Sequence, residues 1–277
     1  MRETIIQRRT EIEDAIRSRL PEADEFDRYR EAPLSIGRPR TRGQVFLALV
    51  DGCTAGHRAL DSDRNRGRGQ SRDHDQEQVL PIAAALELAS LQTDVHRTAF
   101  DHSSSGPPDY DPTRDILRGD LLESTAFETM LSVCGPPRMV QRYFAILVRA
   151  NRRVQEGHAT GYEADAASTA DLDAVRQLGA LTGGAAELAA LVAEIESDDR
   201  QRLIDHGTAL GFHVSAHLNS GAAPTETRSS SKSIDACHRH IDALADCCPS
   251  QSRDRVRRQL RAFLEVATNY ESVESVV

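Results

Sequence analysis

The spacing of apolar residues is the feature that most limits what this chain can fold into. Apolar side chains recur every four residues at Ile12, Ile16 and Leu20, which places them on one face of a helix. No stretch shows the sustained alternation of β-branched residues that is typical of strands. The sequence therefore predicts an all-α protein. Further helices are predicted over residues 44–55, 78–98, 114–133, 139–157, 171–197, 200–219, 234–247 and 252–270.

Polar segments rich in Gly, Ser or Pro separate these predicted helices. Residues 61–77 contain no apolar side chain, and residues 102–112 and 220–233 combine Ser, Gly and Pro. We expect all three to be loops, flexible near 61–77 and 220–233. A chain of 277 residues is long enough for one large domain, so we expect a single domain spanning residues 1–277.

Charge and hydropathy exclude several classes of protein. The chain has 34 Lys and Arg residues against 43 Asp and Glu residues, a net charge of -9, whereas nucleic-acid binding usually needs a basic face. The first twenty residues mix acids with bases and contain no long apolar run, so neither a signal peptide nor a membrane span is predicted there. We expect a cytoplasmic protein without nucleic-acid partners.

Residues 86–101, LELASLQTDVHRTAFD, have the frame of a metal-binding helix. Their Glu-Leu start and His96 resemble the first aspartate-rich helix of the trans-isoprenyl diphosphate synthases, the polyprenyl synthetase family. In that family a DDxxD motif follows the histidine. Here its first two positions hold Arg97 and Thr98, and only Asp101 keeps the carboxylate.

The resemblance continues through other segments in the family's order, over roughly residues 35–270. The most specific is ILRGDLLESTAF, residues 116–127, which resembles the family's ILAGDYLLARAF. The resemblance implies a bundle of about ten or more helices around a central cavity. Further similar segments are Ser168–Ala170 with Leu178–Ala180 (KTA and LGA), Leu210–Gly211 (LG), and Ala243–Asp254 (ALxxLPxSxxRD).

The second aspartate-rich motif of the family is absent. It should follow Leu210 and Gly211, close to Asn219, but no Asp or Glu occurs between Asp205 and Glu226. In the family, both motifs hold Mg²⁺ ions that stabilise the departing diphosphate, because Mg²⁺ prefers oxygen ligands. The resemblance therefore implies at most one remaining metal ligand, Asp101. We expect no cofactor, or Mg²⁺ if activity remains.

The diphosphate of the second substrate is held in the family by a GKRxRP motif. Here IGRPRTRG offers Arg38, Arg40 and Arg42 in an altered order. These arginines form either an anion site or a solvated loop, and the two interpretations have equal weight. Ser90 occupies a position where the family has His or Gln, so this part of the site is also weakened.

Two other features have a functional and a structural interpretation. Arg97 can replace a metal ion and bind a diphosphate, since guanidinium groups bind phosphate oxygens in pairs, or it can simply pair with Asp94 or Asp101. The structural interpretation is favoured. His213 and His217 have the i, i+4 spacing of a metal-binding pair, but without a third ligand they read as ordinary helix residues.

The leading hypothesis is a pseudoenzyme, a non-catalytic or regulatory subunit that pairs with an active prenyl diphosphate synthase. The protein keeps the family's fold segments while most of the metal ligands are replaced. One alternative is a residually active or re-tooled prenyltransferase that condenses isopentenyl and allylic diphosphates. Another is a module that binds a prenyl chain. The expected partner is an active synthase or a second copy in a dimer, and a prenyl diphosphate or prenyl chain is a possible ligand.

Overall fold

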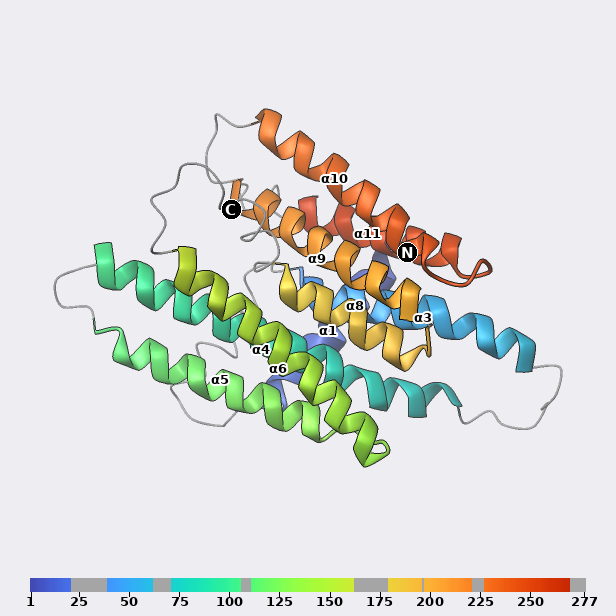
Figure 1. The fold of residues 1–277 in the computed structure, drawn as a ribbon, viewed down its shortest axis with the longest axis horizontal. Coiled ribbons are helices and arrows are strands. Elements are labelled where there is room, and N and C mark those ends of the chain that lie inside the picture. The colour runs from blue at the N-terminus through green and yellow to red at the C-terminus, as the bar shows by residue number, and fades with distance from the viewer. Residues whose placement is uncertain are drawn as a thin grey trace.

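The computed structural model describes residues 1–20, 39–61, 71–105, 111–161, 179–195, 197–220 and 227–269. Their regular structure is helical, without a strand, which confirms the predicted all-α class (Figure 1). No helix in these ranges combines the length and the apolar character needed to cross a membrane. The helices are α1 (Arg2–Arg17), α3 (Thr41–Asp61), α4 (Ser71–Ser105), α5 (Thr113–Leu131), α6 (Pro137–Gly161), α8 (Ala180–Val192), α9 (Ser197–Ser220), α10 (Thr227–Asp246) and α11 (Arg253–Asn269).

The predicted loops are too long. Helix α4 already begins at Ser71, inside the segment 61–77, and α10 begins at Thr227, inside the segment 220–233. Helix α4 also continues to Ser105. A helix that has started extends one hydrogen bond at a time without needing a buried face, and Arg, Gln and Glu are good helix formers. Apolar spacing therefore identified the packed parts of these helices and missed their polar ends.

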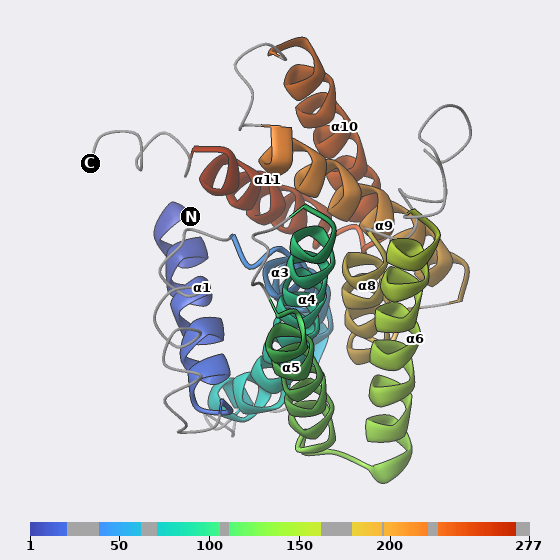
Figure 2. The ribbon, with the colours of Figure 1, turned by 90° about the vertical axis from the view of Figure 1, so that its left-hand side faces the viewer.

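Helix α4 is the central element of the bundle. Every residue from Ile82 to Thr93 is buried, because α1, α3, α5, α6 and α8 all contact this helix. Figure 2 shows α4 with α1 on one side and α6 and α8 on the other. A helix that is apolar on all sides belongs in a core, and the run LPIAAALELASL supplies such a surface.

Small residues bring α8 and α9 close together. A Cβ atom added at Gly211 would lie 2.3 Å from Thr182 Oγ1, and one at Gly207 would lie 2.8 Å from Ala186 Cβ. The Ala and Gly content of the predicted helix 171–197 indicated such a contact. The structure places the helix at Ala180–Val192, while residues 171–178 lie outside the described ranges.

The helix directions define two ends of the bundle. Helices α4, α6 and α9 finish at one end, where α5 and α8 begin (Figure 1). We call this the motif end, because it carries Asp101 and Asn219. The short connections from α5 to α6 and from α8 to α9 lie at the opposite end (Figure 1). The segment that resembles the first aspartate-rich motif and the expected position of the second thus reach the same end of the molecule from distant parts of the sequence.

Candidate functional site

The imidazole of His96 is engaged at both ring nitrogens. Gln92 Nε2 donates to His96 Nδ1 across 2.8 Å. The other ring nitrogen, His96 Nε2, lies 3.1 Å from the carbonyl oxygen of Ile116 on α5. Because an amide nitrogen only donates, Nδ1 accepts and Nε2 carries the proton. Asp120 Oδ1 also lies 3.4 Å from Nε2, next to this contact. His96 therefore joins α4 to α5 at the motif end.

The resemblance assigns Arg97 to the first carboxylate position of the motif. Its Nη2 lies 3.7 Å from Asp94 Oδ1, and its side chain is 37% exposed. The hydroxyl of Thr98, at the second position, donates to the backbone oxygen of Asp94 across 2.9 Å. Asp101 is exposed one turn further along the same helix. Asp94, Arg97 and Asp101 thus lie one turn apart on the same side of α4, with the arginine between the two aspartates.

These side chains do not fit the magnesium cluster that the resemblance implies. Mg²⁺ needs oxygen ligands in near-octahedral order, and a guanidinium group has no acceptor to offer. Arg97 also places a positive charge where the family places negative charge. Among the residues that the structure describes, no group of three or more His, Cys, Asp or Glu side chains is arranged to hold a metal ion.

The position of the second motif lies on the last turns of α9. Asn219 belongs to this helix, at the motif end, but its side chain lies outside the described part of the chain. His217 and Leu218, just before it, are half-buried. Arg38, the first of the candidate diphosphate ligands, also lies outside the described residues.

Arg40, the second candidate diphosphate ligand, is buried with only 2% of its surface exposed. Its Nε lies 3.4 Å from Glu13 Oε1 on α1. Burial lowers the pKa of Arg40, and the negative charges of Glu87 and Glu13 act in the opposite direction. Glu87 also accepts a hydrogen bond of 2.8 Å from the backbone N–H of Gly43, in the first turn of α3. Arg40 therefore belongs to an internal charge cluster of α1, α3 and α4.

This cluster lies well away from the altered aspartate motif. Glu87 and Asp101 are fourteen residues apart on α4. A rise of about 1.5 Å per residue separates them by roughly 21 Å along the helix. Arg42 is half-buried beside this cluster, and its Nε has no hydrogen-bond partner. Ser90 is 4% exposed, one turn after Glu87.

A group of histidines joins α9 to α10. His206 Nδ1 lies 3.2 Å from His240 Nδ1, and the ring of His213 stacks on His240 with centroids 5.6 Å apart. Burial lowers the pKa of all three imidazoles, that of His240 to about 4. The i, i+4 spacing selected His213 with His217, whereas the structure pairs His213 with α10. The sequence indicates part of this group, because His206 and His213 are seven residues apart and therefore lie on one face of the helix.

Comparison with solved structures identifies the fold. The geranylgeranyl pyrophosphate synthetase of Pyrococcus horikoshii aligns over 95% of this chain and 98% of its own, with a TM-score of 0.68 and 16% identity. A synthase from Zymomonas mobilis described as FPP/GFPP synthase aligns over 95% and 98%, with a TM-score of 0.69 and 17% identity. The geranyl diphosphate synthase small subunit of Antirrhinum majus aligns over 94% and 97%, with a TM-score of 0.61 and 18% identity.

The chain therefore has the fold of the trans-isoprenyl diphosphate synthases, over nearly its whole length. Neither a model of a protein family nor a curated protein sequence matches it.

Proposed function

We propose that this protein is a catalytically impaired member of the polyprenyl synthetase family that serves as a non-catalytic subunit of an active prenyl diphosphate synthase in the cytoplasm. The observation that carries the proposal is the motif end of α4. There Arg97 and Thr98 stand at two carboxylate positions, and only Asp101 remains. The fold that surrounds this site is shared with the synthetase of Pyrococcus horikoshii and with the geranyl diphosphate synthase small subunit of Antirrhinum majus.

The replaced residues act against the family's reaction. Ionisation of an allylic diphosphate releases a leaving group whose negative charge must be stabilised, and in the family Mg²⁺ ions do this. Arg97 is a fixed cation that repels Mg²⁺, and Thr98 uses its hydroxyl within the helix. Without a second acidic motif on α9, loss of several ligands removes many kcal/mol of transition-state stabilisation. We expect no metal cofactor.

Helix α5 offers a surface for a partner chain. Leu117, Leu121 and Leu131 are 61%, 39% and 56% exposed. Residues four and fourteen positions apart lie on one face of a helix, so these leucines share a face, which we call the stripe; on it the exposed Ser124 and Glu128 separate Leu131 from the other two. Large apolar side chains gathered on one face commonly mark protein–protein contacts. We propose that the stripe packs on a chain of the same fold, either an active synthase or a second copy.

Activity of the purified protein is the first test. The protein alone, incubated with isopentenyl and allylic diphosphates and Mg²⁺, should yield no condensation product. Co-expression with an active synthase from the same genome should give a stable complex with altered product length or raised thermal stability. Mg²⁺-dependent condensation by the purified chain alone would contradict the proposal.

The stripe on α5 provides a second test. The Leu117→Glu and Leu121→Glu double variant should abolish association, since two charges would be buried at the contact. Arg153→Glu, on the exposed face of α6, is a matched control and should leave association intact. Size-exclusion chromatography with light scattering measures both. Association unaffected by the double variant would exclude this surface.

A second function is favoured by one observation. Arg97 keeps only a 3.7 Å contact with Asp94 and is partly exposed, so its guanidinium can reach a ligand at the motif end. A residually active or re-tooled prenyltransferase would use it to hold diphosphate without metal. Diphosphate binding that persists in EDTA and is lost in Arg97→Ala would support this alternative. Thermal stabilisation by prenyl alcohols but not by diphosphates would instead support a module that binds only the prenyl chain.

A further inference from the structure

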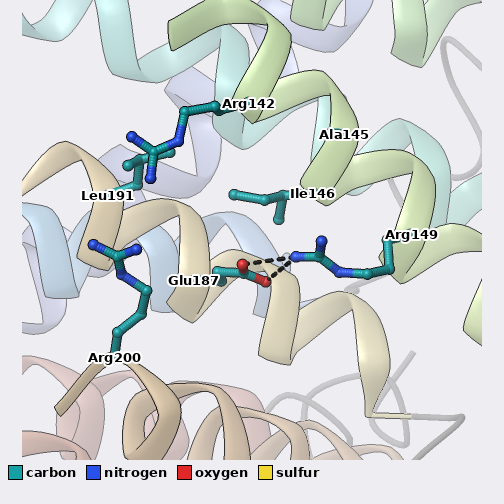
Figure 3. Close-up of a pocket in the computed structure, with 7 residues that line it drawn as sticks. All are labelled: Arg142, Ala145, Ile146, Arg149, Glu187, Leu191 and Arg200. Carbon is teal, nitrogen blue, oxygen red and sulfur yellow. Dashed lines mark hydrogen bonds and ion pairs between the residues drawn. The ribbon is translucent and has the colours of Figure 1, made fainter. Parts of the chain in front are cut away.

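A cavity of about 150 Å³ lies between α6, α8 and the start of α9 (Figure 3). Arg142 lies early in α6, Leu191 at the end of α8 and Arg200 in the first turns of α9, so the cavity belongs to the end of the bundle opposite the motif end. It shares no lining residue with the altered motifs. The lining residues are Arg142, Ala145, Ile146, Arg149, Glu187, Leu191 and Arg200.

The cavity is positively charged in a protein that is acidic overall. Three arginines and one glutamate line it, a formal balance of +2, while the whole chain carries -9. Arg149 Nη2 contacts both carboxylate oxygens of Glu187 at 2.6 Å, so this pair is neutral as a unit. The excess positive charge therefore belongs to Arg142 and Arg200.

These two arginines lack acidic partners among the described residues. Arg142 Nη1 has only a 4.0 Å contact with the sulfur of Met139. Arg200 Nη2 donates to the backbone oxygen of Ile195 across 3.1 Å, while its Nε is buried without a hydrogen-bond partner. A buried charged donor without an acceptor is costly. Figure 3 shows the two guanidinium groups directed toward the same part of the cavity, beside Leu191.

We propose that this cavity binds a small phosphate-type oxyanion between Arg142 and Arg200. Planar guanidinium groups donate in pairs to phosphate oxygens, and neither Arg142 nor Arg200 already gives its terminal nitrogens to a carboxylate of the described residues. Ile146 and Leu191 give the cavity an apolar wall suited to a short organic group on the phosphate. The bound anion links α6 to α9 at the end of the bundle opposite the motif end.

Titration calorimetry with inorganic pyrophosphate, inorganic phosphate and phenyl phosphate at constant ionic strength tests the site. The expected result is saturable binding of one anion per chain. Tighter binding of phenyl phosphate than of inorganic phosphate would identify a phosphorylated organic ligand, and the reverse order a free oxyanion. Absence of saturable binding by all three anions would overturn the proposal.

Variants locate the binding site and separate it from the motif end. Arg142→Gln with Arg200→Gln should weaken binding at least tenfold, whereas Arg153→Gln, an exposed arginine of the same helix α6, should leave it unchanged. Arg97→Gln, at the motif end, should also have no effect. Binding that is lost in Arg97→Gln and kept in the double variant would place the anion at the motif end and overturn the proposal.

One substitution is expected to act in the opposite direction. Glu187→Gln removes the only negative charge among the described lining residues and releases Arg149 for the ligand. It should tighten anion binding several-fold. Thermal unfolding without ligand shows whether each variant is folded. Unchanged or weaker binding by folded Glu187→Gln would contradict an electrostatic site in this cavity.

Discussion

The ring of His96 lies directly against Gly119 at the contact between α4 and α5. A Cβ atom added at Gly119 would lie 2.1 Å from both Cδ2 and Nε2 of the imidazole. Both residues come from segments that resemble the synthases, the metal-binding helix and the ILRGDLLESTAF segment. The histidine and the glycine are thus kept in a contact that joins helices, independently of any metal chemistry.

Replacement of Gly119 by Ala is predicted to destabilise the fold. The methyl group overlaps the His96 ring, and the ring cannot move away without breaking its contacts with Gln92 and Ile116. Overpacking of this kind costs about 1–3 kcal/mol. Urea unfolding, followed by circular dichroism, measures the change in free energy.

Two controls accompany this variant. Gly135→Ala, where an added Cβ meets nothing within 4 Å, should change stability by no more than about 0.5 kcal/mol. Adding His96→Ala to Gly119→Ala should recover part of the loss, because the clashing ring is removed. If the two substitutions were strictly additive, the proposed clash would be incorrect.

Replacement of Arg40 by Met should be strongly destabilising. The substitution removes the guanidinium that offsets the carboxylates of Glu87 and Glu13, and Glu13 keeps Arg9, whose Nε lies 2.9 Å from its Oε1. Removing one partner of a buried charge group costs about 3–5 kcal/mol. Thermal and urea unfolding measure the loss. If Arg40 instead served a solvated anion site, its replacement would affect stability little.

A surface arginine and a compensating variant test this explanation. Arg17, whose Nη1 lies 2.7 Å from Asp14 Oδ1, is 43% exposed, so Arg17→Met should cost under about 1 kcal/mol. Glu87→Gln added to Arg40→Met removes the carboxylate that has lost its compensating charge, keeps an oxygen to accept from the Gly43 N–H, and should restore part of the stability. Failure of this second substitution to help would argue against a charge effect.

Stability should fall on acidification through the histidines of α9 and α10. Burial sets the folded-state pKa of His206, His213 and His240 below the ordinary value of 6.5, with His240 at about 4. Between these values the unfolded chain binds more protons than the folded one. The free energy of unfolding is therefore fully retained above about pH 6.5, where these histidines are neutral in both states. It decreases as the pH falls toward about 4. Arg202 and Arg239 lower these pKa values further, while Asp205 opposes the shift at His206.

The histidine effect is isolated by comparing pH profiles. His240→Gln keeps a polar group at the contact but cannot be protonated in this range. Its free energy of unfolding should decrease less than that of the natural chain between about pH 6.5 and pH 4. Parallel profiles would show that other groups cause the acid sensitivity.

Restoring the carboxylates of the first motif should restore metal binding but not catalysis. The double variant Arg97→Asp with Thr98→Asp adds two aspartates to Asp101, so that three carboxylates lie on one face of α4. Mg²⁺ should then raise the melting temperature of the variant and not that of the natural chain, and EDTA should reverse the shift. Condensation activity should stay undetectable, because α9 still lacks its acidic motif.

Much of the fold could be predicted from local patterns. The spacing of Ile12 and Ile16 predicted α1, and apolar periodicity predicted the central part of α4, because helix formation and amphipathicity depend on residues three to four positions apart. The polar ends of α4 and α10 were missed, since a helix can extend without an apolar face. The resemblance to the synthases arranged these helices in the correct fold.

The candidate site was only partly predictable. The sequence alone predicts that Arg97 and Thr98 replace carboxylates, because this prediction concerns which residues occupy the frame of the resembling helix. The burial of Arg40 was not visible: a basic, Pro-containing segment suggested either an anion site or a solvated loop. Its acidic neighbours Glu13 and Glu87 lie far away in the sequence and become neighbours only after folding.

By itself, the sequence determined that the protein is helical, and its resemblance to the synthases predicts that most of the metal-binding carboxylates are replaced. The tertiary structure decided which charges are internal and which remain available. It placed Arg40 between acidic residues of α1 and α4, and it brought Arg142 and Arg200 together without a carboxylate partner for either among the described residues. The physical reason is that helix formation depends on neighbours along the chain, whereas the pairing of a charge depends on side chains contributed by other helices.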